Sequence, residues 1–223
     1  MTNKTSRVSL KRLLKENKNL ILFISLMCVF RSAVADWYTV PTGSMLPTIQ
    51  LGDRITVNKM AYDLRVPFSS ISVYEIAEPE RGDIVVFESK AANERLIKRI
   101  IGLPGDRIAM LDDVVFLNGK ALPYKVTRQS DGKVITEEKI DEISHIVNID
   151  KNAPEFLSSF SEVEVPKESY LVLGDNRRNS SDSRVYGFVP RSELRGKAYH
   201  VVFSSDYDNY YIPRSERVLQ SLY

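Results

Sequence analysis

The chain has 223 residues, of which 43% are hydrophobic and 27% charged. This composition is typical of a globular protein, and the length suits one domain with an added segment. The net charge of +2 is uneven, because the first 18 residues carry +5 and residues 37–223 carry −3. A negative body has no general attraction for nucleic acid, and the single cysteine, Cys28, excludes an internal disulfide and a cysteine-rich metal site.

An apolar stretch at residues 19–36 follows the basic leader, residues 1–18. A helix over residues 20–35 would be about 24 Å long, and extending it to Trp37 brings it close to the ~30 Å of a bilayer's hydrocarbon layer, so it could barely span, with Trp37-Tyr38 at the interface. The positive leader then predicts a cytoplasmic N-terminus and a body on the outer face. A cleavable signal peptide ending at Ala33-Val34-Ala35 explains the pattern equally well, whereas the lack of a polar stripe disfavours a buried amphipathic helix.

The rest of the chain reads as mainly β. Short runs of β-branched and aromatic residues, separated by turn signals, predict strands at 54–58, 83–87, 114–117, 169–173 and 198–203. Asn118-Gly119 between two such runs predicts a tight hairpin. Residues 127–165 are polar, so we expect an exposed insertion there that adds little to the core.

A candidate nucleophile, Ser44, lies in a segment with restricted backbone geometry. Pro41 fixes its own φ, Gly43 allows conformations closed to other residues, and Pro47 ends any helix that might begin here. A plain turn between two strands would explain these residues as well. The choice depends on whether another residue can take the proton of the serine.

Two kinds of base could activate Ser44. The histidines, His145 in the polar stretch and His200 in an apolar strand pattern, are better explained as structural or exposed residues. Lys98 stands within an apolar run, where burial would lower its pKa and favour a serine–lysine dyad, although a lysine snorkelling at the surface is the alternative. Strand alternation places Lys98 and Arg99 on opposite faces, so we expect only one of them to point inward.

Five motifs follow one another in a characteristic order. They span Pro41–Thr48, Gly52–Asp53, Arg81–Phe87, Lys98–Asp106 and Gly174–Arg184. In these motifs the chain resembles bacterial type I signal peptidase, a membrane-anchored peptidase that removes signal peptides from exported preproteins. The resemblance extends from the apolar segment to about Phe203.

The resemblance implies roles for the residues that match each motif. Ser44 matches the nucleophile and Lys98 the general base, and Thr42 matches a hydroxyl that forms the oxyanion hole with the Ser44 N–H. The family's shallow substrate pockets correspond to residues beside the dyad: Tyr38, Val40, Leu96 and Ile97. No metal or organic cofactor is implied.

The last motif implies a supporting set of residues. Ser180 matches a serine that hydrogen-bonds the catalytic lysine, and Asp182 and Arg184 match a structural ion pair. Arg178 departs from the pattern, because many members have an acidic residue at that position. Any charge pairing that relatives make there is therefore in doubt for this chain.

The family's architecture is an antiparallel β catalytic core with an inserted smaller β subdomain, preceded here by one transmembrane helix. The expected segments are a leader at 1–18, an anchor at 19–36, the core at 37–106 and 166–223, and the insertion at 107–165. The expected location is the bacterial inner membrane, with the catalytic part on the outer face.

The implied partners are the lipid bilayer and preprotein signal peptides with small residues at the first and third positions before the cut, without nucleic acid. A plasmid-transfer or pilin-maturation peptidase of the same family is an alternative function. A non-enzymatic, membrane-anchored β module is another, and it would require Lys98 at the surface. A self-cleaving repressor with this dyad would need a DNA-binding domain before the serine, where this sequence has mostly the apolar segment.

Overall fold

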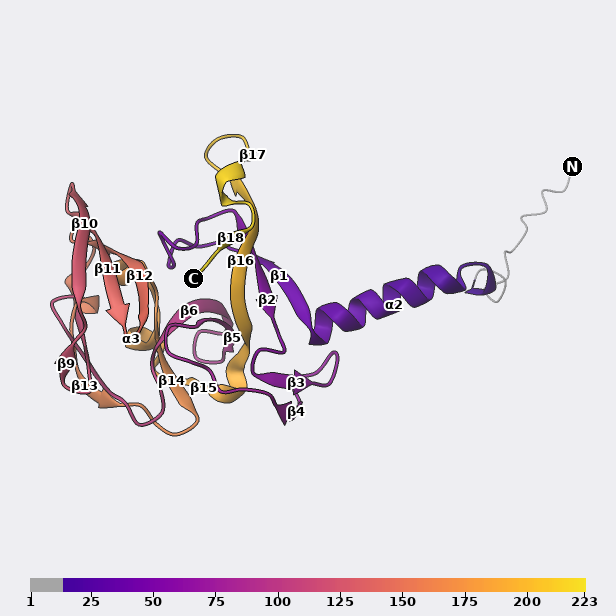
Figure 1. Cartoon of the computed structure of the whole chain (residues 1–223), viewed down its shortest axis with the longest axis horizontal. Helices are drawn as coiled ribbons and strands as arrows, with labels where there is room; N and C mark the ends of the chain where they lie inside the picture. Colours follow the sequence, from indigo (N-terminus) through magenta and orange to yellow (C-terminus); the bar gives the residue numbers. More distant parts are fainter. Residues whose placement is uncertain (1–13) are drawn as a thin grey trace, which may run out of the picture.

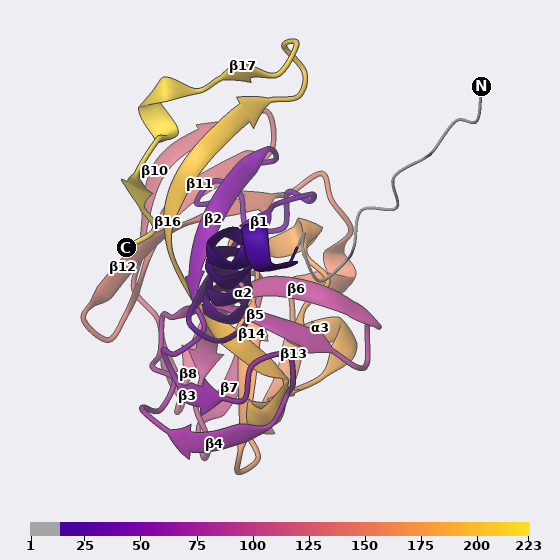
Figure 2. The same cartoon turned by 90° about the vertical axis from the view of Figure 1, so that its right-hand side faces the viewer.

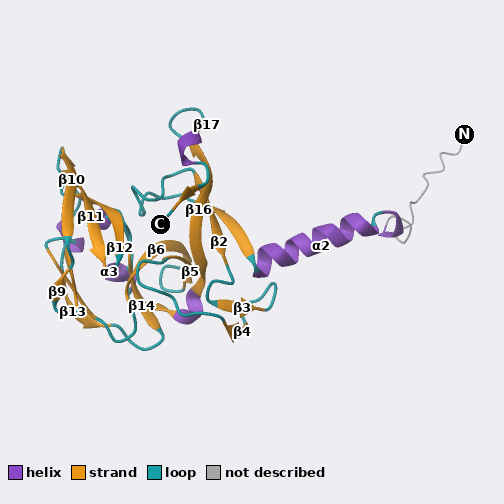
Figure 3. Ribbon diagram, viewed as in Figure 1, coloured by secondary structure: helices purple, strands orange, loops and turns teal. Residues whose placement is uncertain are grey.

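The computed structural model describes residues 14–223, and it is built mainly from β-strands (Figures 1 and 3). Every pair of neighbouring strands in the described part of the chain is antiparallel. The prediction of a mainly β protein is therefore confirmed. The β-branched runs form strands because alternate side chains can pack on a buried face of a sheet.

The largest sheet has nine strands in the order β1-β2-β16-β5-β6-β14-β15, with β17 and β18 also paired to β16. Its long central strand, β16, is the yellow ribbon in Figure 1. The strands are β1 (Ala35–Thr39), β2 (Asp53–Asn58), β5 (Ile84–Ser89), β6 (Glu94–Gly102), β14 (Ser169–Leu173), β15 (Val189–Pro190), β16 (Leu194–Asp206), β17 (Ile212–Pro213) and β18 (Gln220–Ser221).

Two smaller sheets lie between β6 and β14 in the sequence. One has the order β13-β7-β8-β9 and the other β10-β11-β12. Because β6 and β14 pair with each other, the chain leaves the large sheet and returns beside the point of departure. The strands are β7 (Arg107–Leu111), β8 (Val114–Leu117), β9 (Lys120–Ala121), β10 (Tyr124–Ser130), β11 (Lys133–Ile140), β12 (Ile143–Asp150) and β13 (Phe160–Glu164).

The expectation that residues 127–165 are exposed is wrong for β11 and β12. Alternate side chains of these strands are buried, among them Glu138, His145, Val147 and Ile149. The sequence looks polar because the opposite face is solvated and because three of the buried residues, Thr136, Glu138 and His145, are themselves polar. Buried polar groups that pair with one another are invisible to a count of hydrophobic residues.

The remaining regular elements are short. The strands β3 (Asp63–Arg65) and β4 (Ser72–Glu75) form a separate hairpin. The short helices are η1 (Glu155–Leu157), η2 (Arg177–Asn179), α3 (Ser183–Tyr186), η3 (Arg191–Glu193) and η4 (Ser215–Arg217).

The helix α2 (Lys18–Ala33) extends away from the β body, as Figure 1 shows, and it is seen end-on in Figure 2. Its large apolar side chains are exposed, and only Ala33 is buried. Within residues 14–223, the structure contains no helix with the length and apolar character needed to cross a membrane. The helix ends before the predicted boundary because Ala35 begins β1, where it pairs with Asn58 of β2. Residues 1–13 of the expected leader lie outside the described residues.

Candidate active site

The loop that carries Ser44 follows β1 and is held from two sides. Met45 and Ile49 are buried in the core beneath it. From above, Asn176 donates its backbone N–H to the Ser44 carbonyl at 3.0 Å and its side-chain amide to the Gly43 carbonyl at 2.9 Å. These contacts fix the backbone on both sides of the Ser44 hydroxyl, so the nucleophile candidate is preorganised by residues distant in sequence.

Lys98 lies on β6 and points to Ser44. Its Nζ is 2.8 Å from the Ser44 Oγ and also donates to the Ile97 carbonyl at 3.0 Å. The Lys98 side chain is buried, with only 2% of its surface exposed. This burial is incompatible with a lysine that snorkels at the surface, which the non-enzymatic alternative required.

Burial lowers the pKa of Lys98 to about 8, because an ammonium group loses its hydration inside the protein. The carboxylates of Asp182, Glu94 and Asp175 act in the opposite direction, and the Arg184 guanidinium adds to the lowering. About half of the Lys98 side chains are therefore neutral at pH 8, and a smaller fraction is neutral at pH 7. A neutral amine at hydrogen-bonding distance from a hydroxyl is the geometry that general-base activation requires.

The expectation that only one of Lys98 and Arg99 points inward is wrong, because both faces of β6 are covered. Arg99 is 1% exposed and binds Asp175 through two hydrogen bonds, of 2.9 and 2.7 Å. Asp175 also accepts a hydrogen bond from Thr48, in the loop after Ser44. The two faces of β6 therefore have different roles. Lys98 contacts the nucleophile, whereas Arg99 binds Asp175, which also binds Thr48 in the Ser44 loop.

The candidate oxyanion hole lies beside Ser44. Thr42 is exposed and lines the same cavity as Ser44 and Lys98. Within residues 14–223, the Ser44 N–H donates no hydrogen bond, so it is free to bind a developing negative charge. The two groups that the resemblance assigned to this role are thus both available at one edge of the cavity.

The supporting residues differ from expectation at one position. Ser180 is 2% exposed, but its hydroxyl has no hydrogen-bond partner among residues 14–223, and Lys98 donates to Ser44 and Ile97 instead. The Asp182–Arg184 ion pair is present at 2.6 Å, and Asp182 also accepts the Gly174 N–H at 3.0 Å. The motif therefore supports the site through the backbone of Gly174.

Gly174 stands where the Ser44 and Ser180 segments come together. A side chain here would place its Cβ 2.2 Å from the Ser180 Oγ and 2.5 Å from the Ser44 carbonyl oxygen. Only glycine permits this close approach of the backbone, since the carbonyl cannot move away without shifting the Ser44 loop.

The cavity at the dyad has a volume of about 340 Å³. Of the four residues assigned to the substrate pockets, Leu96 lines this cavity, whereas Tyr38, Val40 and Ile97 pack on the core beneath the sheet. Five further residues line the cavity without a specific role assigned from the sequence: Glu94, Asn176, Asn179, Ser181 and Tyr186. Four of them lie in or just after the last motif, which is the one signal that could have identified them.

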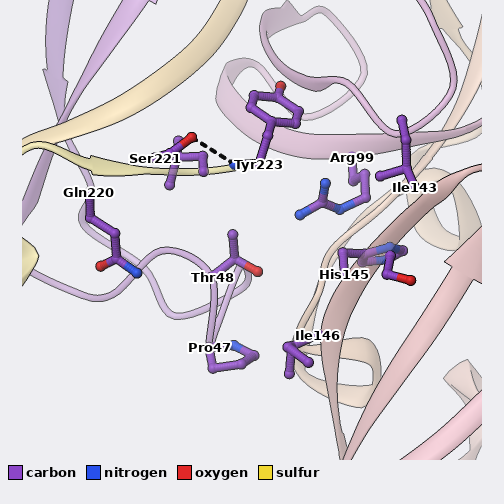
Figure 4. Close-up of a pocket in the computed structure, with 11 residues that line it drawn as sticks. Pro47, Thr48, Arg99, Ile143, His145, Ile146, Gln220, Ser221 and Tyr223 are labelled. Carbon is purple, nitrogen blue, oxygen red and sulfur yellow. Dashed lines mark hydrogen bonds between the residues drawn. The ribbon is translucent and has the colours of Figure 1, made fainter.

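The histidines lie away from the dyad. His200 is exposed on β16, and His145 is 7% exposed and lines a separate cavity of about 640 Å³. Figure 4 shows His145 and Ile146 facing Pro47 and Thr48 across this cavity. Neither histidine contacts Ser44, which leaves Lys98 as the base beside it. Within residues 14–223, no group of three or more His, Cys, Asp or Glu side chains is arranged to hold a metal ion.

Arg178, the residue that departs from the family pattern, is buried beside Asp113. It donates from two nitrogens to the Asp113 carboxylate, at 2.8–3.2 Å, and Lys151 binds the same carboxylate. Burial alone would raise the pKa of Asp113, but the hydrogen bonds from Arg178 and Lys151 outweigh this effect, so the net pKa is lowered. The arginine therefore fixes the last motif to the loop between β7 and β8.

Comparisons with known proteins identify the family of this chain. The family model described as "Signal peptidase, peptidase S26" matches residues 13–203. Signal peptidase I of Pseudomonas fluorescens is 34% identical over 200 residues, which cover 82% of this chain and 69% of the relative. Signal peptidase I of Rickettsia typhi is 36% identical over 230 residues, which cover 92% of this chain and 83% of the relative.

A crystal structure of a signal peptidase I from Enterococcus faecalis is 31% identical, covers 55% of this chain and 98% of that chain, and has a TM-score of 0.37. The assignment rests on the family model, which matches most of the chain, and on the two sequence relatives. This chain belongs to the signal peptidase family, peptidase S26.

Proposed function

We propose that this protein is a membrane-bound serine endopeptidase that removes N-terminal signal peptides from exported preproteins, with Ser44 as nucleophile and Lys98 as general base. The observation that carries the proposal is the 2.8 Å hydrogen bond between Lys98 Nζ and Ser44 Oγ, made by a lysine that is almost completely buried. Membership of the signal peptidase family makes the chain a peptidase and supports signal peptides as its substrates.

The first half of the reaction forms an ester. The neutral Lys98 amine takes the Ser44 proton as the hydroxyl oxygen attacks the carbonyl before the scissile bond. The Ser44 N–H and the Thr42 hydroxyl stabilise the resulting oxyanion. The ammonium form of Lys98 then returns its proton to the leaving amine, and the carbonyl carbon remains bonded to the Ser44 oxygen.

The second half of the reaction hydrolyses that ester. Lys98, neutral again, takes a proton from a water molecule as the water oxygen attacks the ester carbonyl. The same two donors stabilise the second oxyanion. As the intermediate collapses, Lys98 gives its proton to the leaving Ser44 oxygen, which restores the hydroxyl and releases the new carboxylic acid, and this acid then ionises in water. Each step is served by groups that already line the 340 Å³ cavity.

A free strand edge of the protein, to which an extended substrate could bind, lies next to the dyad. The strand β6 pairs with β5 from Glu94 to Arg99, but β14 covers its other edge only from Arg99 to Gly102. In the described part of the chain, Glu94–Lys98 therefore has no strand partner on that edge. A substrate could add there as a further strand, held by its backbone, which suits sequences that share only small side chains near the cut.

Membrane attachment is assigned to α2. A helix whose apolar side chains are exposed on all sides is stable in lipid and poorly stable in water. Leu22, Phe23 and Leu26 of α2 are each about 60% exposed. Arg31, at the end of the helix nearest the body, contacts Trp37 and Asp36, a combination suited to the membrane interface. We assign this end to the outer surface of the inner membrane.

The proposal predicts that Ser44→Ala abolishes cleavage. The purified full chain in a neutral detergent should cut a preprotein whose cleavage site has alanine at the first and third positions before the cut. Because alanine has no nucleophilic oxygen, Ser44→Ala should reduce the product to the uncatalysed background, as measured by gel and terminal sequencing.

Ser130→Ala is the matched control, because Ser130 is exposed at the end of β10. It should retain wild-type cleavage. Cleavage by Ser44→Ala at the wild-type rate would contradict the assignment of the nucleophile. If even the wild-type protein leaves this preprotein intact but cuts a pilin precursor, the alternative within the family is favoured.

A further inference from the structure

A second charged cavity, of about 270 Å³, lies where α2 meets the β body. The end of α2 and the loop between β3 and β4 form part of its wall, and Phe68 of that loop donates its N–H to the Ser32 hydroxyl at 2.6 Å. Four side chains that line the cavity are cationic and one is acidic: Lys59, Arg65, Arg95 and Arg195, with Glu88.

The positive charge of this cavity is only partly neutralised. Glu88 pairs with Arg95. Two carboxylates next to the cavity are shared with cations outside it. Asp36 binds Lys59 at 3.0 Å but also Arg31 at 2.7 Å. Asp63 binds Arg65 at 2.7 Å but also Arg191 at 2.7 Å, and Arg191 lies 3.4 Å from Glu75 and Glu78 as well. The surplus positive charge of the cavity therefore comes mainly from Arg195.

Two of the arginines have unused hydrogen-bonding capacity. Arg195 has no carboxylate within ion-pair distance in residues 14–223, and its Nη1 donates only to the carbonyls of Ser192 and Leu194. Burial lowers the pKa of Arg195, and the nearby Arg65 contributes to this effect. The Nε of Arg65 has no hydrogen-bond partner among residues 14–223, but it is buried, so a ligand in the open cavity would not reach it. The donors of Arg195 are therefore the ones that remain available to a ligand.

We propose that this cavity binds a phosphate group, such as that of an anionic phospholipid headgroup. Guanidinium groups recognise phosphate oxygens through paired, charge-assisted hydrogen bonds, and the surplus positive charge requires an anion. The cavity adjoins Ser32 and Ala33, at the end of the helix that we assign to the membrane. That the phosphate belongs to a lipid rests on the proposed membrane attachment of α2, whereas the binding of an anion in the cavity does not. Free phosphate offers the same chemistry, so the test must separate the two.

The test measures thermal unfolding of the full chain in a neutral detergent at constant ionic strength. The probes are short-chain phosphatidylglycerol, phosphatidylcholine with the same acyl chains, and inorganic phosphate. Phosphatidylglycerol should raise the Tm of the wild type, because a ligand that binds only the folded state stabilises it. Phosphatidylcholine should raise it less, since its choline cation would be repelled by the same arginines.

Arg195→Gln is the informative variant, because it removes a guanidinium that has no carboxylate partner within the described residues. Without lipid its Tm should stay close to that of the wild type, since the relief of repulsion with Arg65 offsets the loss of the hydrogen bonds to the Ser192 and Leu194 carbonyls. The concentration of phosphatidylglycerol needed for half of the stabilisation should rise by about tenfold or more. Arg128→Gln, a change at an exposed arginine of β10, should leave the lipid response unchanged.

Each outcome has a defined meaning. A response to phosphatidylglycerol alone that depends on Arg195 supports the lipid headgroup, and an equal response to inorganic phosphate supports a general phosphate site. The proposal is overturned if no probe stabilises the wild type, or if Arg195→Gln responds like the wild type. Because unfolding is measured instead of cleavage, this failure would leave the peptidase assignment intact, and loss of cleavage by the wild type would leave the anion site intact.

Discussion

Lys98→Arg is expected to lower kcat on a preprotein by about 10²–10⁴-fold without loss of the fold. Arginine keeps the charge and the approximate length of lysine, but it stays protonated at every accessible pH. It therefore cannot take the proton of Ser44, although it could still donate a hydrogen bond to the Ser44 oxygen. The measurement is kcat at saturating preprotein, with circular dichroism to show that the fold is retained.

The control for this prediction is Lys125→Arg, at an exposed position of β10. It should keep wild-type kcat, which separates the loss of the base from a general effect of arginine. A second test restores the amine chemically: Lys98→Cys in a Cys28→Ser background, alkylated with 2-bromoethylamine, should regain activity. If Lys98→Arg retained kcat within about tenfold of the wild type, another group would have to activate Ser44.

Arg177→Met is expected to reduce the free energy of unfolding by about 3–5 kcal/mol, because it leaves the Glu138 carboxylate buried without its main countercharge. Both side chains are completely buried, and their closest N–O distance is 2.5 Å. Burial alone would raise the pKa of Glu138, but Arg177 and His145 lower it well below its usual value. Urea unfolding with an unchanged m-value would measure the loss.

The same pair makes stability sensitive to acid. The contribution of Glu138 is fully present above its unfolded pKa of about 4.3 and is lost as the pH falls towards its lower folded value. Arg128→Met is the matched control, since Arg128 is exposed and should cost little. Glu138→Met combined with Arg177→Met should recover part of the lost stability, because no unpaired charge remains. A loss below about 1 kcal/mol for Arg177→Met alone would show that Glu138 is compensated by other partners.

The catalytic dyad could be predicted from the sequence more completely than the buried residues that surround it. The strands at 54–58 and 114–117 are recognisable because β-branched runs between turn signals have few other stable conformations. Ser44 and Lys98 were paired through motif order, and the structure brings them into contact across 54 positions. Periodicity alone could not have paired them, because it carries no information about distant contacts.

The errors share a physical cause. Alternation along a strand predicts one buried and one solvent-exposed face. The sheet around β6 is covered on both faces, however, so Lys98 and Arg99 are both buried. Likewise, Glu138 and His145 resemble surface residues in the sequence. They are buried as a pair of polar side chains, and such a pair does not add to the hydrophobicity from which burial is predicted. The direction of the Ser180 hydroxyl depends on a tertiary contact that no local pattern specifies.

The most direct test of the serine–lysine dyad is the pH dependence of kcat/KM for the wild type on a preprotein whose cleavage site has no titratable side chain. Lys98 must be neutral to act, so kcat/KM should rise with pH through a single ionisation and reach half of its maximum near pH 8, the value to which burial lowers the pKa of Lys98. A midpoint near the ordinary lysine value of about 10.4, or a profile that is flat from about pH 6 to 10, would contradict the account.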